Sequence, residues 1–291
     1  MKTLFIVNPI AGRNKSIKIW EKIRHKIYFP HEYILTGAPG EAREIAAEAV
    51  SNGFIRVVAV GGDGTVSEVI NGIANSDAVL GIIPTGTGND FVRSLGISLN
   101  PIDALFVLVS GYSERVDLGI YDGRFYMNIA GAGLDAEVVK IANKKTTYLT
   151  GSLAYVVSLI AALKRFSPRK AIIDIDGKTI HRTVWLISVA NGKYYGGGMK
   201  LCPQAMLNDG YLDICIVNEI SRFELLRFLP KVFKGAHINH PSFEVIRGKQ
   251  VKINFCKPCS VQVDGEVIGK TPLEILVSPN AIRVIMNKRK R

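Results

Sequence analysis

The stretch VVAVGGDGTVSEVI, residues 57–70, decides the fold class of this chain. An apolar run ends in the glycine-rich segment 61–65, and apolar residues at helical spacing follow directly. A buried strand that leads through glycines into a helix is typical of a parallel α/β sheet. The lone carboxylate of Asp63 among these glycines requires an explanation, because it stands where such sheets bind their ligands.

The same alternation of strand and helix continues on both sides of this stretch. Strand-like apolar runs cover residues 2–9, 31–36, 55–62 and 78–84, and helical patterns cover residues 16–27, 39–53 and 66–75. Repeated β–α units predict a mostly parallel, doubly wound sheet with helices on both faces.

The pattern changes near residue 115, where Asp-Gly turns begin to separate strand-like runs. Further strands are expected at 210–218, 243–248, 249–255, 260–269 and 273–286, with helices at 150–165 and 221–235. We therefore predict an α/β protein with a parallel α/β domain over residues 1–120 and a β-rich, antiparallel sandwich domain over residues 121–291. The last residues could pack back on the first domain, and a cleft between the domains is the expected ligand site.

Composition narrows the class of partner. The 291 residues carry a formal net charge of +12, which favours a nucleotide, a nucleic acid or an acidic membrane surface. Aromatic residues make up only 8% of the chain and no nucleic-acid motif is present, so we predict no nucleic-acid partner. No signal peptide opens the chain, and the apolar segment 149–163 is too short to span a bilayer. A cytoplasmic protein with peripheral membrane contact is the expectation, and the basic ending NKRKR is a solvated tail that could also contact lipid headgroups.

Cysteine and histidine motifs predict no metal site of their own. Cys256 and Cys259 form a single C-x-x-C, and neither Cys202 and Cys215 nor the segment HINH at 237–240 completes a zinc ligand set.

The presence of the Asp63 carboxylate among glycines is explained if the glycine loop holds a metal-bound nucleotide. Glycines let the backbone turn and approach phosphate closely, and the following helix begins with a positive dipole end. A carboxylate there would repel phosphate unless it holds Mg²⁺. A second loop, PTGTGND at 84–90, repeats the pattern after the next strand. The standard nucleotide-binding fingerprints G-x-x-x-x-G-K-[ST] and G-x-G-x-x-G are both missing from the two loops.

Five motifs in this order resemble the diacylglycerol kinase catalytic-domain family, which includes bacterial soluble lipid kinases and sphingosine kinases and is distantly related to NAD kinases and phosphofructokinases. They are VNPIAG at 7–12, GGDGT at 61–65, GTGND at 86–90, the segment 191–214 with its polyglycine turn and DGYLD, and VQVDGE at 261–266. The resemblance covers essentially the whole chain, and only GGDGT is shared with the distant relatives.

The resemblance implies an ATP- and Mg²⁺-dependent kinase acting on a lipid hydroxyl, such as that of diacylglycerol, at an anionic membrane surface. Glu266 would be the general base, Asp264 would orient it or the metal waters, and Asp63, with Asp90, would belong to the Mg²⁺–water network. A structural Mg²⁺ would be bound by the Asp209 side chain and by the carbonyls of Met206 and Tyr211. The residues expected to line the ATP site are Asn8, Pro9, Ile10, Ala11, Gly12, Thr36, Gly61, Gly62, Asp63, Gly64, Thr65, Val66, Ser67, Thr87, Asn89 and Asp90.

Other interpretations remain at this point. VDGE by itself predicts a hairpin turn with an exposed glutamate, and LNDGYLD predicts a turn before a strand. The chain could also phosphorylate a small soluble compound, as NAD kinases do, or bind lipid or nucleotide without catalysis. The sequence leaves open the lipid, the preferred phosphate donor and the oligomeric state; a homodimer is common among relatives.

Overall fold

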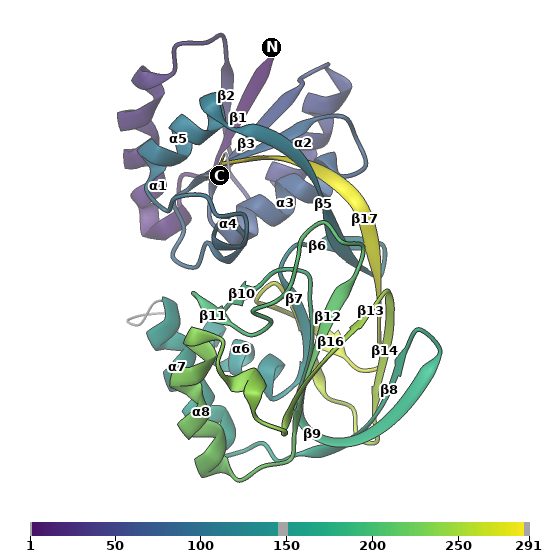
Figure 1. Ribbon diagram of the computed structural model, residues 1–291. Coiled ribbons are helices and arrows are strands. Elements are labelled where there is room, and N and C mark those ends of the chain that lie inside the picture. Colours follow the sequence, from purple (N-terminus) through teal and green to yellow (C-terminus); the bar gives the residue numbers. More distant parts are fainter. Residues whose placement is uncertain (1, 145–150, 288–291) are drawn as a thin grey trace. The chain divides into compact units, whose positions relative to one another are not determined.

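The computed structural model describes residues 2–144 and 151–287 (Figure 1). By its internal contacts the chain forms two compact units: Met1–Leu118 together with Pro279–Arg291 (unit 1), and Gly119–Ser278 (unit 2).

Unit 1 contains the predicted parallel sheet. Its strands β1 (Thr3–Val7), β2 (Glu32–Leu35), β3 (Arg56–Gly61) and β4 (Val79–Pro84) pair in parallel in the order β4-β3-β1-β2. The end of β17 (Leu273–Met286) adds to β4, also in parallel. The core strands consist almost wholly of buried Val, Ile, Leu and Phe, as expected for a sheet covered on both faces. The helices are α1 (Ala11–Ile23), α2 (Glu41–Ser51), α3 (Asp63–Ile73), α4 (Asp90–Ser94) and α5 (Pro101–Ser110), with a 3₁₀ turn at Arg24–Lys26.

The first helix differs from the expectation. It begins at Ala11, directly after the Asn-Pro loop, and becomes a 3₁₀ turn after Ile23 rather than continuing to residue 27. Gly12, Arg13 and Asn14 have positive φ, so the opening turn is distorted. A Cβ on Gly12 would strike the carbonyl oxygen of Thr85, which makes glycine necessary there. Side-chain periodicity does not reveal such an irregular start.

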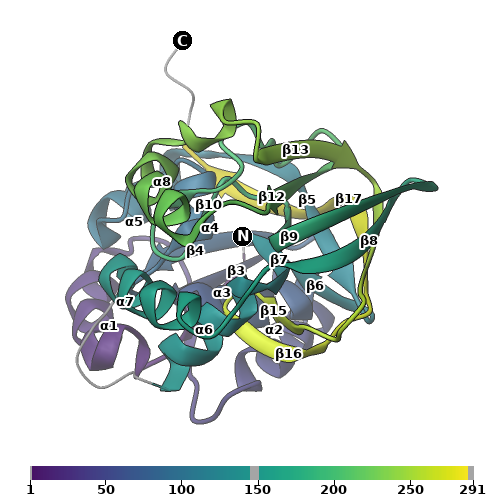
Figure 2. The same cartoon turned by 90° about the horizontal axis from the view of Figure 1, so that it is seen from below.

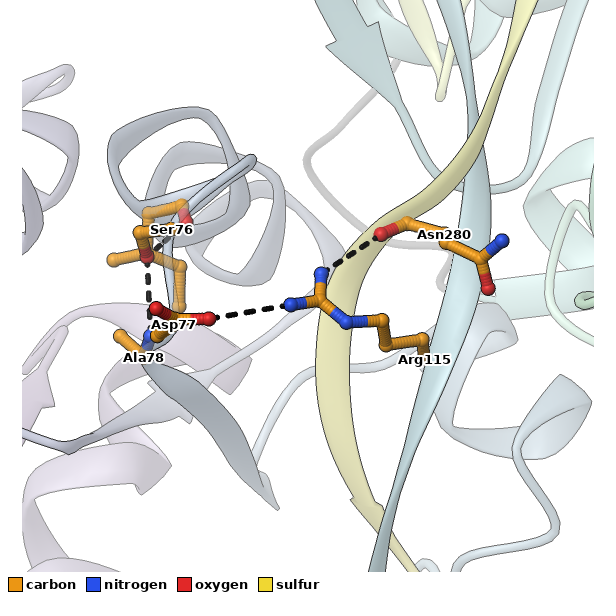
Figure 3. A network of polar contacts seen from close by, with 6 residues as sticks. Ser76, Asp77, Ala78, Arg115 and Asn280 are labelled. Carbon is orange, nitrogen blue, oxygen red and sulfur yellow. Dashed lines mark hydrogen bonds and ion pairs between the residues drawn. The ribbon is translucent and has the colours of Figure 1, made fainter.

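The chain passes between the units in two strands, β5 (Tyr112–Tyr121) and β17. Within unit 1, Arg115 of β5 donates to the carbonyl of Asn280 in β17 (3.1 Å) and to the carboxylate of Asp77 (3.2 Å) (Figure 3). Ser76 beside it closes the turn by donating to Ile73 (2.6 Å). An exposed pair of this kind contributes little stability, on the order of 1 kcal/mol or less, so its effect is to align β5 and β17 with the turn before β4.

Unit 2 is antiparallel and β-rich, as predicted (Figure 2). Its strands follow the order β16-β15-β7-β9-β8-β14, then the first part of β17, and β12 pairs with both β9 and β13. Its core contains fully buried residues of β9 and β12, among them Trp185 and Ile214. The remaining strands are β6 (Arg124–Tyr126), β7 (Ile129–Gly133), β8 (Arg169–Ile175), β9 (Lys178–Ala190), β10 (Tyr194–Tyr195), β11 (Met199–Lys200), β12 (Leu212–Asn218), β13 (Phe243–Gly248), β14 (Gln250–Phe255), β15 (Ser260–Val263) and β16 (Glu266–Lys270).

The helices of unit 2 are α6 (Leu134–Lys144), α7 (Gly151–Leu163) and α8 (Arg222–Lys234), with a 3₁₀ turn at His237–Asn239. Helices α7 and α8 match the two predicted in this region, whereas α6 was not expected. The predicted basic tail at 288–291 lies outside the described residues.

Candidate functional site

The predicted nucleotide residues of unit 1 meet at one edge of the parallel sheet. Asn8 follows β1, Thr36 follows β2 and Thr85 follows β4. Backbone bonds hold these ends together: Thr36 N–H donates to Val7 (2.9 Å), Asn8 N–H to Val60 (3.0 Å) and Thr85 N–H to Gly61 (2.8 Å). Four segments that are distant in sequence therefore form one set of loops at the carboxyl edge, where open α/β sheets bind ligands.

The two glycine loops touch each other backbone to backbone. A Cβ on Gly62 would lie 3.1 Å from the Cα of Gly86, and one on Gly86 would collide with Gly62. A Cβ on Gly61 would collide with Thr65, whose hydroxyl accepts a hydrogen bond from the Asn8 amide (3.0 Å). We call Gly61, Gly62, Gly86 and Gly88 the glycine cradle; their missing side chains allow the two loops to pack this closely.

Asp63 and Asp90 both face the last glycine of this cradle. A Cβ on Gly88 would approach Oδ2 of Asp63 to 2.8 Å and Oδ2 of Asp90 to 3.8 Å. The other oxygen of Asp63 accepts the backbone N–H of Phe91 (3.3 Å). Burial raises the pKa of Asp63 above its ordinary value, and the amides of residues 89–91 oppose that shift. The carboxylate is thus half-buried and held in place at the start of α4.

These two carboxylates fit a hard divalent cation such as Mg²⁺. Oxygen donors are what Mg²⁺ prefers, and it is commonly held by one or two carboxylates with water and substrate phosphates as its other ligands. Within the described ranges 2–144 and 151–287, no group of three or more His, Cys, Asp or Glu side chains is arranged to hold a metal. An ion at Asp63 and Asp90 would therefore complete its shell with water and phosphate oxygen.

Two further glutamates of unit 1, which sequence reasoning missed, shape the loop after β2. Glu68 of α3 accepts the backbone N–H groups of Gly40 (2.9 Å) and Ala42 (3.2 Å) at the start of α2. Glu41 accepts the N–H of Ala38 (3.1 Å). Together they fix the segment that follows Thr36. Glu68 lies 28 residues from Gly40 in sequence, so no local pattern indicates the pairing.

In unit 2, Asp264 occupies the hairpin turn between β15 and β16. It has φ 45° and Gly265 has φ 89°, which is the backbone of a tight Asp-Gly turn. Its carboxylate accepts three backbone N–H groups, from Met127 (2.8 Å), Asn128 (2.9 Å) and Ile129 (3.1 Å). Asp264 therefore holds the start of β7 against the turn, and its predicted role toward the base or metal waters stays a prediction.

Glu266 follows this turn and is exposed. It lines a groove of about 830 Å³ within unit 2, together with Tyr121, Arg124 and Lys270. Burial raises the pKa of Tyr121; Arg124 opposes the shift, and the negative charge of Glu266 adds to it. The carboxylate of Glu266 thus faces a solvent-filled groove that also presents cations.

Asp135 of α6 is a buried acid that sequence reasoning did not single out. It accepts hydrogen bonds from Tyr195 (2.5 Å), Gln262 (2.7 Å) and Tyr155 (3.3 Å). Burial raises its pKa to about 6, and the hydrogen bonds from Gln262 and Tyr155 oppose that shift. Gln262 also accepts the N–H of Gly265 (3.0 Å), so the buried acid is connected to the turn that precedes Glu266.

Comparison with known proteins identifies the family. Residues 2–121 match the diacylglycerol kinase catalytic domain, and residues 128–286 match the YegS C-terminal NAD kinase beta sandwich-like domain. A curated diacylglycerol kinase of Mycobacterium tuberculosis is 34% identical over 98% of this chain and 94% of its own length. The chain belongs to the diacylglycerol kinase family. It is accordingly a lipid kinase.

Other members of the family agree with this assignment. The diacylglycerol kinase of Bacillus subtilis is 33% identical over 98% of this chain and 96% of its own length. A crystal structure of a diacylglycerol kinase from Bacillus anthracis superposes with a TM-score of 0.77 at 25% identity, covering 99% of this chain and 97% of the other. Among the described residues, no helix is long and apolar enough to cross a bilayer.

Side chains of α7 and α8 help to line a small apolar cavity of unit 2, about 60 Å³ in volume. Tyr155 and Tyr195, the two phenols that donate to Asp135, form part of its wall. The polar network of Asp135 therefore adjoins an otherwise apolar space. The other lining residues are Leu134, Leu159, Leu186, Met199, Leu201, Val217, Leu225, Phe228, Leu229, Val232 and Phe243.

The second predicted metal site, at Asp209, Met206 and Tyr211, stays a prediction. Asp209 forms an ion pair with Arg247, and its other oxygen accepts the N–H of Tyr211 (3.1 Å). The guanidinium also lies over the Tyr211 ring at 4.9 Å, with Lys249 at 5.0 Å. Met206 is about half exposed. The Asp209 carboxylate is thus paired with Arg247, and we derive no step from a metal at this position.

Proposed function

We propose that this lipid kinase transfers the γ-phosphate of Mg·ATP to a hydroxyl group of a diacylglycerol-like lipid. The observation that carries the nucleotide part is the glycine cradle, which lies just before α3 and α4 and whose last member, Gly88, lies beside the carboxylates of Asp63 and Asp90. Backbone N–H groups and a helix N-terminus suit phosphate, and the two acids suit the cation that accompanies it.

The residues around the glycine cradle have distinct roles in this proposal. The segments 8–12 and 61–67, with Thr36, Thr87 and Asn89, would line the ATP site. Asp63 and Asp90 would hold Mg²⁺, which when bound neutralises charge on the phosphates. Thr65 and Asn8 fix the loop conformation through their mutual hydrogen bond of 3.0 Å. Phosphoryl transfer asks mainly for such positioning and charge neutralisation, with little covalent chemistry by the protein.

Glu266 would act as the general base. Its carboxylate is exposed in the groove, whereas the neighbouring Asp264 carboxylate is bound to backbone amides. In the proposed step, Glu266 accepts the proton of the lipid hydroxyl while that oxygen attacks the γ-phosphorus and the bond to the β-phosphate oxygen breaks. Asp264 would serve as a positioning residue that fixes the turn.

The acceptor part of the proposal is supported by the names of the curated relatives and by the apolar cavity in unit 2. With about 60 Å³ the cavity is small, so acyl chains would enter only as α7 and α8 move apart. Ligand pockets usually measure about 300–1,000 Å³, so the cavity must widen before it can hold a diacylglycerol.

The test is transfer of label from γ-labelled Mg·ATP to diacylglycerol, with sphingosine and NAD in parallel reactions. We expect label in the organic phase with diacylglycerol and a loss of at least about 10²-fold in kcat/KM for Asp63→Asn. Asp103→Asn, an exposed acid of α5 in the same unit, is the matched control and should keep full activity. Label only on NAD, or equal activity of Asp63→Asn and wild type, would refute the proposal.

A further inference from the structure

Helix α8 has a basic, exposed face and an apolar, buried face on opposite sides. Phe223, Arg227, Lys231 and Lys234 are exposed and recur at intervals of three or four residues, so they share one side of the helix. Phe223 is 75% exposed, which is unusual for so large an apolar side chain. The opposite side buries Leu225, Phe228 and Val232.

The positive charge on the exposed face is not cancelled by acids. The one acid in the helix, Glu224, forms a capping box with Ser221, whose hydroxyl and N–H donate to it at 2.7 and 3.1 Å. Those bonds lower the pKa of Glu224. In the part of the chain that the structure describes, Arg227, Lys231 and Lys234 form no ion pair. We call Phe223, Arg227, Lys231 and Lys234 the basic face of α8.

The buried side of α8 forms a wall of the apolar cavity. Leu225, Phe228 and Val232 line it together with Leu159 of α7. Arg222, at the start of α8, donates to the carbonyl of Phe166 just beyond α7 (3.3 Å), which joins the ends of the two helices. Figures 1 and 2 both show α7 and α8 on the same side of unit 2. One helix thus has cations on its outer side and the cavity on its inner side.

We propose that the basic face of α8 docks on the surface of an anionic bilayer. Three cations on one side would meet phosphate-bearing headgroups, and Phe223 would insert at the boundary between headgroups and acyl chains. Charge complementarity favours this occupant, and the exposed aromatic among the cations is the pattern of helices that lie in a membrane interface. Docking in this orientation brings the wall of the cavity to the membrane. The idea that docking serves lipid uptake rests on the proposed lipid substrate, but the docking itself does not.

The first experiment compares vesicle binding of wild type with the triple variant Arg227→Gln, Lys231→Gln, Lys234→Gln. Sucrose-loaded vesicles of phosphatidylcholine, with or without phosphatidylglycerol, are sedimented at low and high salt. Each cation near an anionic surface contributes about fivefold, so we expect a fall in partition coefficient on the order of 10²-fold.

The matched control removes three exposed lysines from strands and a loop of the same unit: Lys170→Gln, Lys178→Gln, Lys257→Gln. It changes the net charge equally and should bind far better than the α8 variant. Equal loss in both variants would show that only total charge matters and would overturn the proposal. Wild-type binding by the α8 variant would overturn it as well.

A Phe223→Trp variant reports on insertion. Wild type also contains the buried Trp20 and Trp185, so a blue shift of emission on adding anionic vesicles that wild type lacks would come from position 223 and support the proposal. No shift under conditions where the protein sediments with vesicles would overturn it. Turnover of a short-chain, water-soluble diacylglycerol, measured in parallel, tests the proposed function separately. If the short-chain diacylglycerol is not turned over but vesicle binding still depends on α8, the proposed activity is refuted and the docking proposal stands.

Discussion

Replacing Asp264 by asparagine tests whether this acid holds the turn before Glu266. The carboxylate accepts N–H groups with both oxygens, Oδ2 from Met127 (2.8 Å) and Oδ1 from Asn128 (2.9 Å) and Ile129 (3.1 Å). Asparagine tolerates the positive φ of this position, so the backbone of the turn is not strained by the change. Asparagine has only one acceptor oxygen, however, so its side-chain NH₂ group would face one of the backbone N–H donors.

The expected loss follows from this geometry. Asp264→Asn removes the bond to Met127, and hydrogen bonds to a charged group contribute about 1.5–3 kcal/mol each. The bonds to Asn128 and Ile129 become neutral and weaker. We therefore expect the free energy of unfolding to fall by about 2–4 kcal/mol, a large fraction of the about 5–15 kcal/mol typical of folded proteins.

The measurement is urea denaturation followed by circular dichroism, with the shift in midpoint converted through the common slope. Asp122→Asn is the matched control, because Asp122 and Gly123 form the same kind of turn, with φ 45° and 71°. In the described part of the chain, the Asp122 side chain is exposed and shows no hydrogen bond, so its replacement should cost less than about 0.5 kcal/mol. A shift for Asp264→Asn as small as that of the control would refute the argument.

Four further outcomes are expected. Glu266→Gln should lower kcat by about 10²-fold or more with little change in KM for ATP, and unchanged kcat would exclude it as the base. Gly88→Ala, whose Cβ would lie 2.8 Å from Oδ2 of Asp63, should raise KM for ATP about tenfold or more, and an unchanged KM would contradict the cradle. Leu159→Trp should fill the apolar cavity and reduce turnover of long-chain more than of short-chain diacylglycerol; equal reduction would remove the cavity from lipid binding. Because the folded-state pKa of Asp135, about 6, exceeds an unfolded value of about 3.9, this group's contribution to stability falls as pH rises from about 4 to 6. The expected decline in the free energy of unfolding between pH 4 and pH 7 is about 3 kcal/mol. Asp135→Asn should remove it, as measured by urea denaturation at the two pH values.

The sequence predicts what depends on local pattern. The strands of unit 1 and the glycine loops after them are visible because buried parallel strands are continuous apolar runs and because the loops require glycine. Helix α5 and helix α6 were not predicted: apolar residues of α5 occur on both its faces, with Phe106 exposed and Leu108 buried, so its periodicity is weak. Helix α6 begins directly after Gly133, the last residue of strand β7, so no loop separates the two elements.

What the sequence does not predict is which distant groups a side chain meets. Glu68 appears as a surface residue of a helix, yet it accepts amides of the next segment in space. Asp209 is a predicted metal ligand by resemblance, and the sequence does not indicate that Arg247, 38 residues away, pairs with it. Asp135 gives no signal in the sequence, because the hydroxyls and the amide that surround it come from several separate segments.

The Asp-Gly turns of unit 2 show how one local pattern can have different consequences. Asp122, Asp176 and Asp264 all have φ between 45° and 50°, as the dipeptide predicts. Asp176 accepts backbone N–H groups of Lys249 and Gln250, and Asp264 accepts those of residues 127–129. For VDGE, the interpretation as a hairpin and the interpretation as a catalytic segment are therefore compatible. The turn uses one acid to bind the backbone, and because that turn is fixed, the acid two residues later is held in the groove and stays exposed.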